Sequence, residues 1–542
     1  LFYFVAFCVM TYPLIRMFNT HFFTDNGDGL QNVWNLWWVN KSITQLGRSP
    51  WQTDYLHYPH GISLLGHTLN PFNGFISIPM LRFLTLTQAH NVVILFSFVV
   101  GGLTAFFLAY YLTRAYWPSL VAGIIFSFSS FHFTHAEGHM HLVALEWIPL
   151  FMLCWYVLLT KPSLPKAIAA AVTLFLVILC DYYYFLYSVL AAVFMLMWYA
   201  IWKRDLLFFL RKPYLAAMGV FLVGSAVMSG TLVVALLRLQ LEDPLLATYV
   251  PERFSLDLLA PFIPGGHWRF AELTKAYWSR LPGNIHESSV HLGLSLVFVL
   301  IYTAIKRRRA QMPSLGYWYF LLFFFALMSL GPVLHIWGRQ ISSVKLPYDL
   351  FFQKLFPPLR VARVPVRMMV MVFLSASVIG ATGLKLLYQQ STRTRALAAI
   401  LIALMAVEYW PTPIPATQIA LPPYITLLKS LPGNEAVADT VTYAPIALYF
   451  QTIYEKPMAF GYVARVPAST EAKDQQLRAI IDAGQYPVLC REYGIRYLLT
   501  DSKREVLGTD PSIQVLHAGE GVRLYDLGAG AICQVAPATR RQ

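Results

Sequence analysis

Long apolar segments, separated by short polar ones, are the feature that most constrains this chain. A helix needs about 20 predominantly apolar residues to cross a bilayer. Segments that reach or approach this length lie at 1–18, 90–113, 117–133, 142–160, 166–180, 183–202, 214–240, 289–305, 314–332, 364–387 and 396–412. We therefore predict a mainly α-helical, polytopic transmembrane bundle of about eleven spans.

The composition excludes an ordinary soluble protein. Of the 542 residues, 57% are hydrophobic and only 13% are charged, whereas soluble proteins average about 25% charged residues. The net charge of +14 could indicate a nucleic-acid partner. We reject that partner because most basic residues stand in short loops between apolar segments, where they set the topology of a membrane protein.

The basic residues predict an orientation. They fall in alternate loops, at Arg114, Lys161, Lys166, Lys203, Arg204, Arg211, Lys212, Lys306, Arg307, Arg308, Arg309, Lys385, Arg393 and Arg395. The positive-inside rule makes these loops and the N-terminus of a cell-membrane protein cytoplasmic. Loops 19–89, 241–288 and 333–363 then face outside with the C-terminal tail. This pattern requires that residues 72–86 form an interfacial or re-entrant helix, not a span.

The tail differs in character from the rest of the chain. After a proline-rich linker at about residue 413 come strand-like runs at 436–442, 495–501, 513–519 and 521–528, with a helical stretch at 470–484. Strands that alternate with a helix predict a small α/β domain. We expect a transmembrane catalytic module at 1–412 and an extracytoplasmic domain at 413–542. Cys490 and Cys533 could pair there, but no CxxC motif is present and we expect free thiols.

The stretch TDNGDGLQNVWNLWW at 24–38 joins Asp25 and Asp28 to tryptophans such as Trp34 where the first segment ends. A charge at bilayer depth costs about 2.5–3.5 kcal/mol on insertion scales, and tryptophan is typical of the headgroup level. We interpret this stretch as a reaction centre at the membrane surface. Asp and Gly also form ordinary turns. That alternative stays open for Asp25, whereas we favour a functional role for Asp28.

Other reactive side chains occur in the loops assigned to the same outer side. They are His57, His135, Glu137, His139, His141, Asp181, His286, Glu287, His291, Arg360, Arg363 and Arg367. A carboxylate can orient a hydroxyl or take its proton, and arginine can bind phosphate through two hydrogen bonds. Carboxylates and arginines at one membrane interface suit sugar transfer from a polyprenyl phosphate, whose lipid tail would lie between the helices.

Each of these features also has a structural interpretation. The HAEGHMH segment could bind a metal, but no ligand spacing is evident and a solvated polar loop is the alternative we favour. Glu287 could cap the helix that follows it. Arg363 and Arg367, at i and i+4, could extend to lipid headgroups. Pro365 suits a first helical turn, which would place Arg367 just inside the helix.

At these residues the chain resembles the GT-C superfamily of multispanning membrane glycosyltransferases, which use lipid-phosphate sugars. The resemblance covers roughly 1–390 and rests on the order of NGDGLQNVWNLWW, YPHGISL, TLNPFNGFISIPM, GHMHLVALEWIPL, ESSVHLGLSLV and RVPVRMMVM. It is strongest to a bacterial, poorly characterised branch. The lack of a WWDYG-like signature argues against protein N-glycosylation.

The resemblance implies roles for individual residues. Asp28 would be the catalytic base or would orient the acceptor, with Asp25 a weaker candidate. Glu137 or Glu287 would match a second acidic residue, and Arg363 or Arg367 would hold the donor phosphate. We also expect Glu137, His139, Trp34 and His57 to contact substrate. A divalent metal such as Mg²⁺ or Mn²⁺ is compatible with the resemblance, because some members use one and others do not.

The sequence thus predicts an inverting, hexosyltransferase-type membrane enzyme. It would transfer a sugar from a polyprenyl-phosphate donor to an extracytoplasmic lipid, glycan or protein acceptor in the cell envelope. One alternative is a transporter or flippase for a lipid-linked glycan, although such proteins tend to carry polar residues near mid-membrane. The other is a non-catalytic assembly protein whose tail does the binding.

Overall fold

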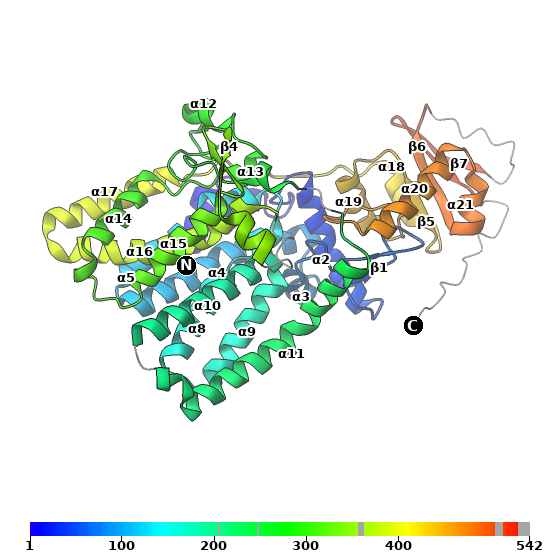
Figure 1. Ribbon diagram of the computed structural model, residues 1–542. Coiled ribbons are helices and arrows are strands. Elements are labelled where there is room, and N and C mark those ends of the chain that lie inside the picture. Colours follow the sequence, from blue (N-terminus) through cyan, green and yellow to red (C-terminus); the bar gives the residue numbers. More distant parts are fainter. Residues whose placement is uncertain (204–205, 247–248, 356–362, 504–512, 529–542) are drawn as a thin grey trace. The chain divides into compact units, whose positions relative to one another are not determined.

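The computed structural model describes residues 1–203, 206–246, 249–355, 363–503 and 513–528 (Figure 1). Contacts between residues divide the chain into two compact units. Unit 1 comprises residues 1–23, 88–231 and 249–416, and unit 2 comprises 24–87, 232–248 and 417–542. Unit 2 therefore includes a segment of the N-terminal region together with the tail.

Unit 1 is built from helices with short connections. They are α1 (Phe2–Met10), α4 (Leu86–Thr113), α5 (Tyr116–Ser127), α6 (Ser130–Ala136), α7 (Met140–Val143), α8 (Trp147–Thr160), α9 (Leu164–Cys180), α10 (Tyr182–Lys203), α11 (Lys212–Glu242), α14 (Leu294–Ile305), α15 (Leu315–Ser329), α16 (Met369–Gln390) and α17 (Thr392–Glu408). The first two residues of α4 and the last turns of α11 belong to unit 2.

Several of these helices can cross a membrane. Within the described residues, five segments are long and apolar enough: Leu86–Thr113, Met140–Thr160, Tyr182–Lys203, Lys212–Glu242 and Pro365–Gln390. Shorter apolar helices lie at Tyr116–Ser127, Leu164–Cys180, Leu294–Ile305 and Leu315–Ser329. The chain is a multi-pass membrane protein, and the predicted fold class is confirmed. The first predicted span differs, because α1 has only nine residues.

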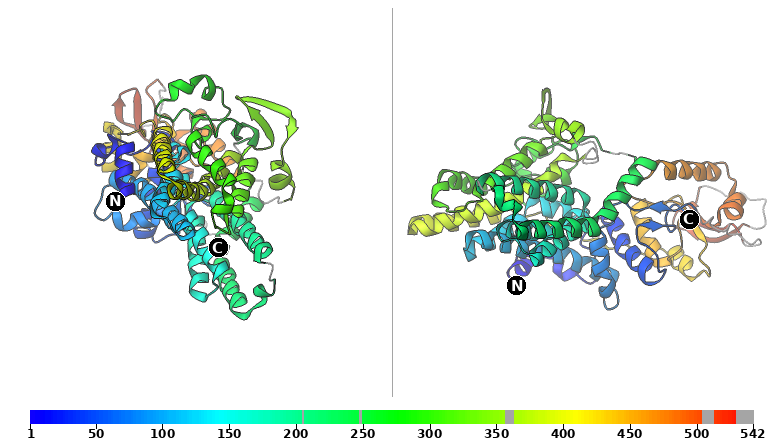
Figure 2. Two further views of the ribbon diagram at one scale, coloured as in Figure 1. Left: turned by 90° about the vertical axis from the view of Figure 1, so that its left-hand side faces the viewer. Right: turned by 60° about the horizontal axis from the view of Figure 1, so that its bottom comes forward.

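Helix α16 is the central helix of unit 1. Its residues from Met369 to Leu384 are all buried, and it packs against α5, α14, α15 and α17 (Figures 1 and 2). Helix α8 packs against α9 and α10. In contrast, only 11% of the most apolar 18-residue stretch of α11 is buried within the protein. An apolar helix with so much exposed surface is stable in lipid, where apolar side chains need no burial in protein.

Short elements fill the connections of unit 1. They are η1 (Leu14–Met17), η2 (Leu206–Leu210), η3 (Pro251–Phe254), η4 (Ala271–Thr274), α12 (Lys275–Trp278), α13 (Ile285–Ser288), η5 (Arg307–Arg309), the antiparallel strands β3 (Val333–Ile336) and β4 (Arg339–Lys345), the π-helix η6 (Asp349–Leu355) and the 3₁₀ turn η8 (Pro365–Met368). Asp257 joins two of these connections. Its Oδ1 accepts from the Tyr277 hydroxyl at 2.9 Å, and its Oδ2 accepts from Gly338 N at 2.7 Å.

Unit 2 contains the predicted α/β domain. Its sheet has the order β5 (Ala436–Asp439), β6 (Ile495–Asp501), β8 (Val522–Asp526), β7 (Gln514–Gly519), with β5 and β6 parallel and the other pairs antiparallel. The helices of the tail are α18 (Pro423–Ser430), α19 (Ala444–Tyr454), α20 (Ala468–Asp482) and α21 (Tyr486–Tyr493). The predicted strands and the helix at 470–484 are confirmed.

The N-terminal segment of unit 2 supplies α2 (Asp28–Thr44), α3 (Pro71–Met80) and the short strands β1 (Gln52–Thr53) and β2 (Ile62–Ser63). Helix α3 has ten residues, too few to cross a bilayer. This agrees with the prediction that 72–86 does not span.

The tryptophans of α2 lie in the core of unit 2. Trp34 and Trp38 are fully buried and stack with ring centroids 5.7 Å apart. The Trp34 indole donates to Gln451 Oε1 of α19 at 2.7 Å. Apolar residues of the tail cover their rings, and Gln451 satisfies the Trp34 indole N–H.

One thiol prediction is wrong. Cys490 is disulfide-bonded, whereas we expected it to be free. Cys533 lies outside the described residues. Cys8, Cys154 and Cys180 are free.

Candidate active site

The predicted site residues fall into two groups, one in each unit. Asp25, Asp28, Trp34 and His57 belong to unit 2. Glu137, His139, Glu287, Arg363 and Arg367 belong to unit 1.

Asp25 organises the start of α2. Its Oδ1 accepts from the backbone N–H of Gly27 at 3.0 Å and of Gly29 at 2.9 Å. Backbone donors in the first turn have no partner within the helix, so this carboxylate satisfies them. Gly29 is required at this point, since a Cβ there would overlap the side chain of Thr24. Asp25 therefore has a structural role beside Asp28.

Asp28 is the first residue of α2 and is half-buried. Its Oδ1 accepts from the Tyr462 hydroxyl at 2.5 Å. A carboxylate in the first turn of a helix is also stabilised by the positive end of the helix dipole. The side chain is thus oriented by Tyr462, while part of the residue stays open to solvent.

His67 supports the same region as a neutral imidazole. Its Nδ1 accepts from Ala464 N at 3.1 Å, so its Nε2 carries the proton and donates to Asn35 Oδ1 at 2.9 Å. Burial lowers the pKa of His67 to about 3, although the Asp28 carboxylate opposes that shift.

His57 lies in a different contact of unit 2. Its Nδ1 lies 2.8 Å from Asp474 Oδ2 of α20, and its side chain is 3% exposed. Trp34 is likewise buried and bonded to Gln451. Both residues bind other groups of the protein and hold the N-terminal segment against the tail.

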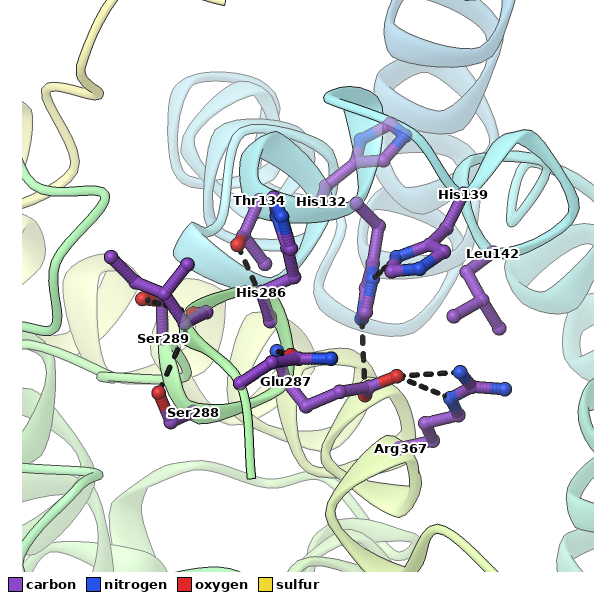
Figure 3. A network of polar contacts seen from close by, with 12 residues as sticks. His132, Thr134, His139, Leu142, His286, Glu287, Ser288, Ser289 and Arg367 are labelled. Carbon is purple, nitrogen blue, oxygen red and sulfur yellow. Dashed lines mark hydrogen bonds and ion pairs between the residues drawn. The ribbon is translucent and has the colours of Figure 1, made fainter. Parts of the chain in front are cut away.

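In unit 1, Arg367 and Glu287 form a buried ion pair (Figure 3). Arg367 Nε and Nη2 lie 2.9 Å and 2.5 Å from Glu287 Oε1. Pro365 opens the turn η8, so Arg367 lies just inside the helical segment, as predicted. The alternative that Arg367 extends to lipid headgroups is wrong, because it is 7% exposed. Arg363 precedes this turn and is half-buried.

The capping alternative for Glu287 is also wrong. Its backbone N–H donates to Asn284 Oδ1 at 2.8 Å in the short helix α13, and its carboxylate binds Arg367. The longer helix α14 is capped by Glu408, whose Oε1 accepts from Leu294 N at 3.0 Å.

The histidines of unit 1 gather around this pair. His135 Nδ1 lies 3.1 Å from His139 Nδ1, and His135 Nε2 lies 3.8 Å from Glu287 Oε2. His135 is fully buried and Glu137 is 8% exposed, so the alternative of a solvated polar loop is wrong. Burial, followed by the neighbouring His139 and Arg367, holds the pKa of His135 well below its ordinary value. His135 is therefore a neutral imidazole at pH 7.

A second group lies next to the first. Glu137 Oε1 lies 2.7 Å from His267 Nδ1, and Glu137 Oε2 lies 3.8 Å from His286 Nδ1. The ring centroids of His139 and His286 are 5.6 Å apart, which makes the two groups neighbours. His267 was not expected from the sequence, since GGHWRF in a long loop carries no recognisable motif.

Unit 1 therefore brings together Glu137, His139, Glu287 and Arg367, which the sequence had placed in three separate loops. The group combines two carboxylates, an imidazole and one paired guanidinium. Such side chains can bind a cation, a phosphate or the hydroxyls of a sugar.

The fold is similar to that of multispanning membrane glycosyltransferases of known structure. The structure of the arabinofuranosyltransferase AftD from Mycobacteria is similar with a TM-score of 0.56 and 13% identity, over 97% of this chain and 40% of AftD. ArnT from Cupriavidus metallidurans, solved bound to undecaprenyl phosphate, is similar with a TM-score of 0.50 and 10% identity, over 98% of both chains. This chain thus spans about two fifths of the length of AftD.

The chain belongs to the family described as "Domain of unknown function (DUF6311)", whose model matches residues 1–410. No curated protein matches the sequence. The expected resemblance to GT-C proteins is confirmed at the level of the fold.

Proposed function

We propose that this protein is a membrane glycosyltransferase that moves a sugar from a polyprenyl-phosphate donor to an acceptor outside the cytoplasm. The observation that supports this most is the fold shared along nearly the whole chain with ArnT, whose structure holds undecaprenyl phosphate. The half-buried Asp28 adds a carboxylate suited to proton transfer.

In this proposal the Asp28 carboxylate takes the proton of the acceptor hydroxyl. The acceptor oxygen attacks the anomeric carbon of the sugar from the face opposite the phosphate. The bond between that carbon and the phosphate oxygen breaks, and the polyprenyl phosphate leaves with the electron pair. The configuration at the anomeric carbon is thereby inverted. Tyr462 and Asp25 act as positioning residues for Asp28.

Residues of unit 1 bind the donor. Arg363 or Arg367 holds the donor phosphate; Arg363 is the more accessible of the two, and Arg367 is paired with Glu287. Glu137 and His139 offer hydrogen bonds to sugar hydroxyls. Trp34 and His57 act indirectly, by holding α2 and its Asp28 in place.

We further propose the topology that the basic loops favour. The N-terminus is cytoplasmic, and the loops that carry Asp28, Glu137 and Glu287 lie outside with the tail. The transmembrane module at 1–412 performs the transfer, and the domain at 413–542 supports it from outside. The sugar is a hexose-type group, and the acceptor is a component of the cell envelope.

The test compares wild type with Asp28→Asn in nanodiscs, using a panel of polyprenyl-phosphate sugars and an envelope extract as the acceptor source. Release of polyprenyl phosphate is followed by mass spectrometry. Loss of a general base should lower turnover about 10²–10⁴-fold. The control is Asp54→Asn, which removes an exposed carboxylate of the same unit that pairs with Arg48 at 2.9 Å. Equal turnover in wild type and Asp28→Asn would show that another group is the base.

A further inference from the structure

We propose that His135, His139 and Glu287 form a binding site for one zinc-type transition-metal cation. Each of the three offers a ligand atom, and these atoms lie within 4.8 Å of one another. The site is built from two histidines one helical turn apart and a glutamate nearly 150 residues further along the chain.

The distances suit a shared cation after small side-chain rotations. Zinc binds histidine nitrogen and carboxylate oxygen at about 2.0–2.2 Å, so two of its ligand atoms lie roughly 3–4 Å apart. His135 Nε2 lies 3.8 Å from Glu287 Oε2, which is within that range. One ligand atom from each of the three residues lies within 4.8 Å of the others, so rotation of the His139 side chain completes the set.

Two buried polar atoms point to a ligand here. Within the described part of the chain, His135 Nε2 and Glu287 Oε2 have no hydrogen-bond partner, and the two side chains are 0% and 4% exposed. Their separation of 3.8 Å is too long for a hydrogen bond between them. Buried polar atoms are nearly always satisfied, and one cation between them would satisfy both.

The surrounding residues orient these ligands. Arg367 occupies Glu287 Oε1 and leaves Oε2 directed at His135. Figure 3 shows the Glu287 carboxylate pointing toward Arg367, with the His139 ring above it in that view. The backbone N–H of His139 donates to the carbonyl oxygen of His135 at 2.8 Å, which places His139 one turn beyond it. Fixed outer contacts of this kind increase metal affinity.

The donor set indicates the kind of metal. Imidazole suits zinc and other late transition metals, whereas magnesium and calcium prefer oxygen ligands. Two histidines and one glutamate are also a set found in zinc enzymes that keep a fourth position open.

The neighbouring set of Glu137, His267 and His286 is a weaker candidate. Its ligand atoms also lie within 4.8 Å. However, the Glu137 carboxylate already pairs with His267 Nδ1 through Oε1 at 2.7 Å, whereas Glu287 Oε2 has no hydrogen-bond partner in the described part of the chain. Glu137 instead adds negative charge beside the first set, which favours a cation there.

The test measures metal binding by the full-length protein in nanodiscs after treatment with a chelator. Zn²⁺ is titrated against a fluorescent zinc indicator, and Co²⁺ is added separately to record its visible absorption. We expect one Zn²⁺ per chain, a Co²⁺ spectrum typical of nitrogen and oxygen ligands, and no displacement by excess Mg²⁺. His135→Gln and His139→Gln should each weaken Zn²⁺ binding by at least about tenfold.

The control is Glu137→Gln, whose affinity for Zn²⁺ should stay within a few-fold of the wild-type affinity. Each variant is first checked for monodispersity, and the Co²⁺ spectrum of wild type does not depend on any variant folding. Absence of Zn²⁺ binding in wild type would overturn the proposal. So would binding that survives both histidine variants, or binding lost only in Glu137→Gln. None of these readouts requires sugar transfer, so the metal site and the proposed function are tested separately.

Discussion

Arg367 donates through both Nε and Nη2 to a single oxygen of Glu287, at 2.9 Å and 2.5 Å, and both side chains are buried. The two residues are 80 positions apart. The pair joins the short helix α13 to the turn η8, which leads directly into α16, the central helix of unit 1. Each charge is tolerated in this buried position because the other balances it.

Breaking this pair should destabilise unit 1. We predict that Glu287→Gln and Arg367→Met each lower the free energy of unfolding by about 3–5 kcal/mol, since each leaves one buried charge without its partner. The double variant should lose less than the sum of the two single variants. Thermal unfolding in detergent, followed by loss of the monodisperse peak, measures the difference.

The control for that series is the exposed pair of Glu272 and Lys275. Glu272→Gln should change the stability by less than about 1 kcal/mol, because water screens an exposed pair. Losses that simply add in the double variant of Glu287 and Arg367 would mean that the two side chains are not coupled.

Tyr462 should affect catalysis more than stability. Its hydroxyl donates to Asp28 Oδ1, and a hydrogen bond to a charged group is worth about 1.5–3 kcal/mol. Tyr462→Phe should therefore lower kcat about 10–100-fold and leave the KM for the lipid donor nearly unchanged. Tyr443→Phe, at an exposed position of the same unit, is the control. A rise in KM with constant kcat would assign Tyr462 to donor binding instead.

Gly29 should tolerate no larger residue. A Cβ at this position overlaps Thr24, and the backbone N–H of Gly29 binds Asp25. Gly29→Ala should shift the start of α2 and lower turnover at least about tenfold, since small misplacements of a reacting group are costly. Gly230→Ala, where a Cβ meets no atom within 4 Å, should retain wild-type turnover. Full activity of Gly29→Ala would show that the start of α2 is not part of the site.

Because His67 gains a proton on unfolding, unit 2 should become less stable as the pH falls below 6.5. Burial lowers the folded pKa of His67 to about 3 from 6.5, so the unfolded chain binds a proton between these values and the folded chain does not. Stability is therefore complete above pH 6.5 and falls as the pH drops, by up to about 1.4 kcal/mol per pH unit. The change in Tm between pH 7 and pH 5 should be smaller in His67→Gln than in wild type. Equal changes would show that His67 is protonated in the folded protein.

Local sequence patterns were sufficient for most of the fold. Apolar runs predicted α4, α5, α8, α9, α10, α11, α14, α15, α16 and α17 to within about six residues at each end, because length and hydropathy decide which segments can cross a membrane. They did not predict the short helices α6, α7, α12 and α13 as separate elements. Alternating runs in the tail predicted β5, β6, β7 and β8. The position of Trp34 could not be predicted, since its burial depends on Gln451, more than 400 residues away.

The candidate site was predictable in its residue types but not in its partners. The sequence pointed to Asp28, Glu137, Glu287 and Arg367 as unusual polar residues near helix ends. It could not pair Asp28 with Tyr462, or Glu137 with His267, because both contacts depend on how distant loops pack. Hydrophobic periodicity describes each segment separately and carries no information about such pairs.

The most direct test of the account asks whether the protein cleaves a lipid-linked sugar or only moves it. Wild type is reconstituted into vesicles with a polyprenyl-phosphate sugar, and the lipid fraction is analysed with an envelope extract present. We predict free polyprenyl phosphate together with sugar on an acceptor, both absent in Asp28→Asn. An intact donor that crosses to the other leaflet, with no polyprenyl phosphate released, would contradict the account and identify a transporter.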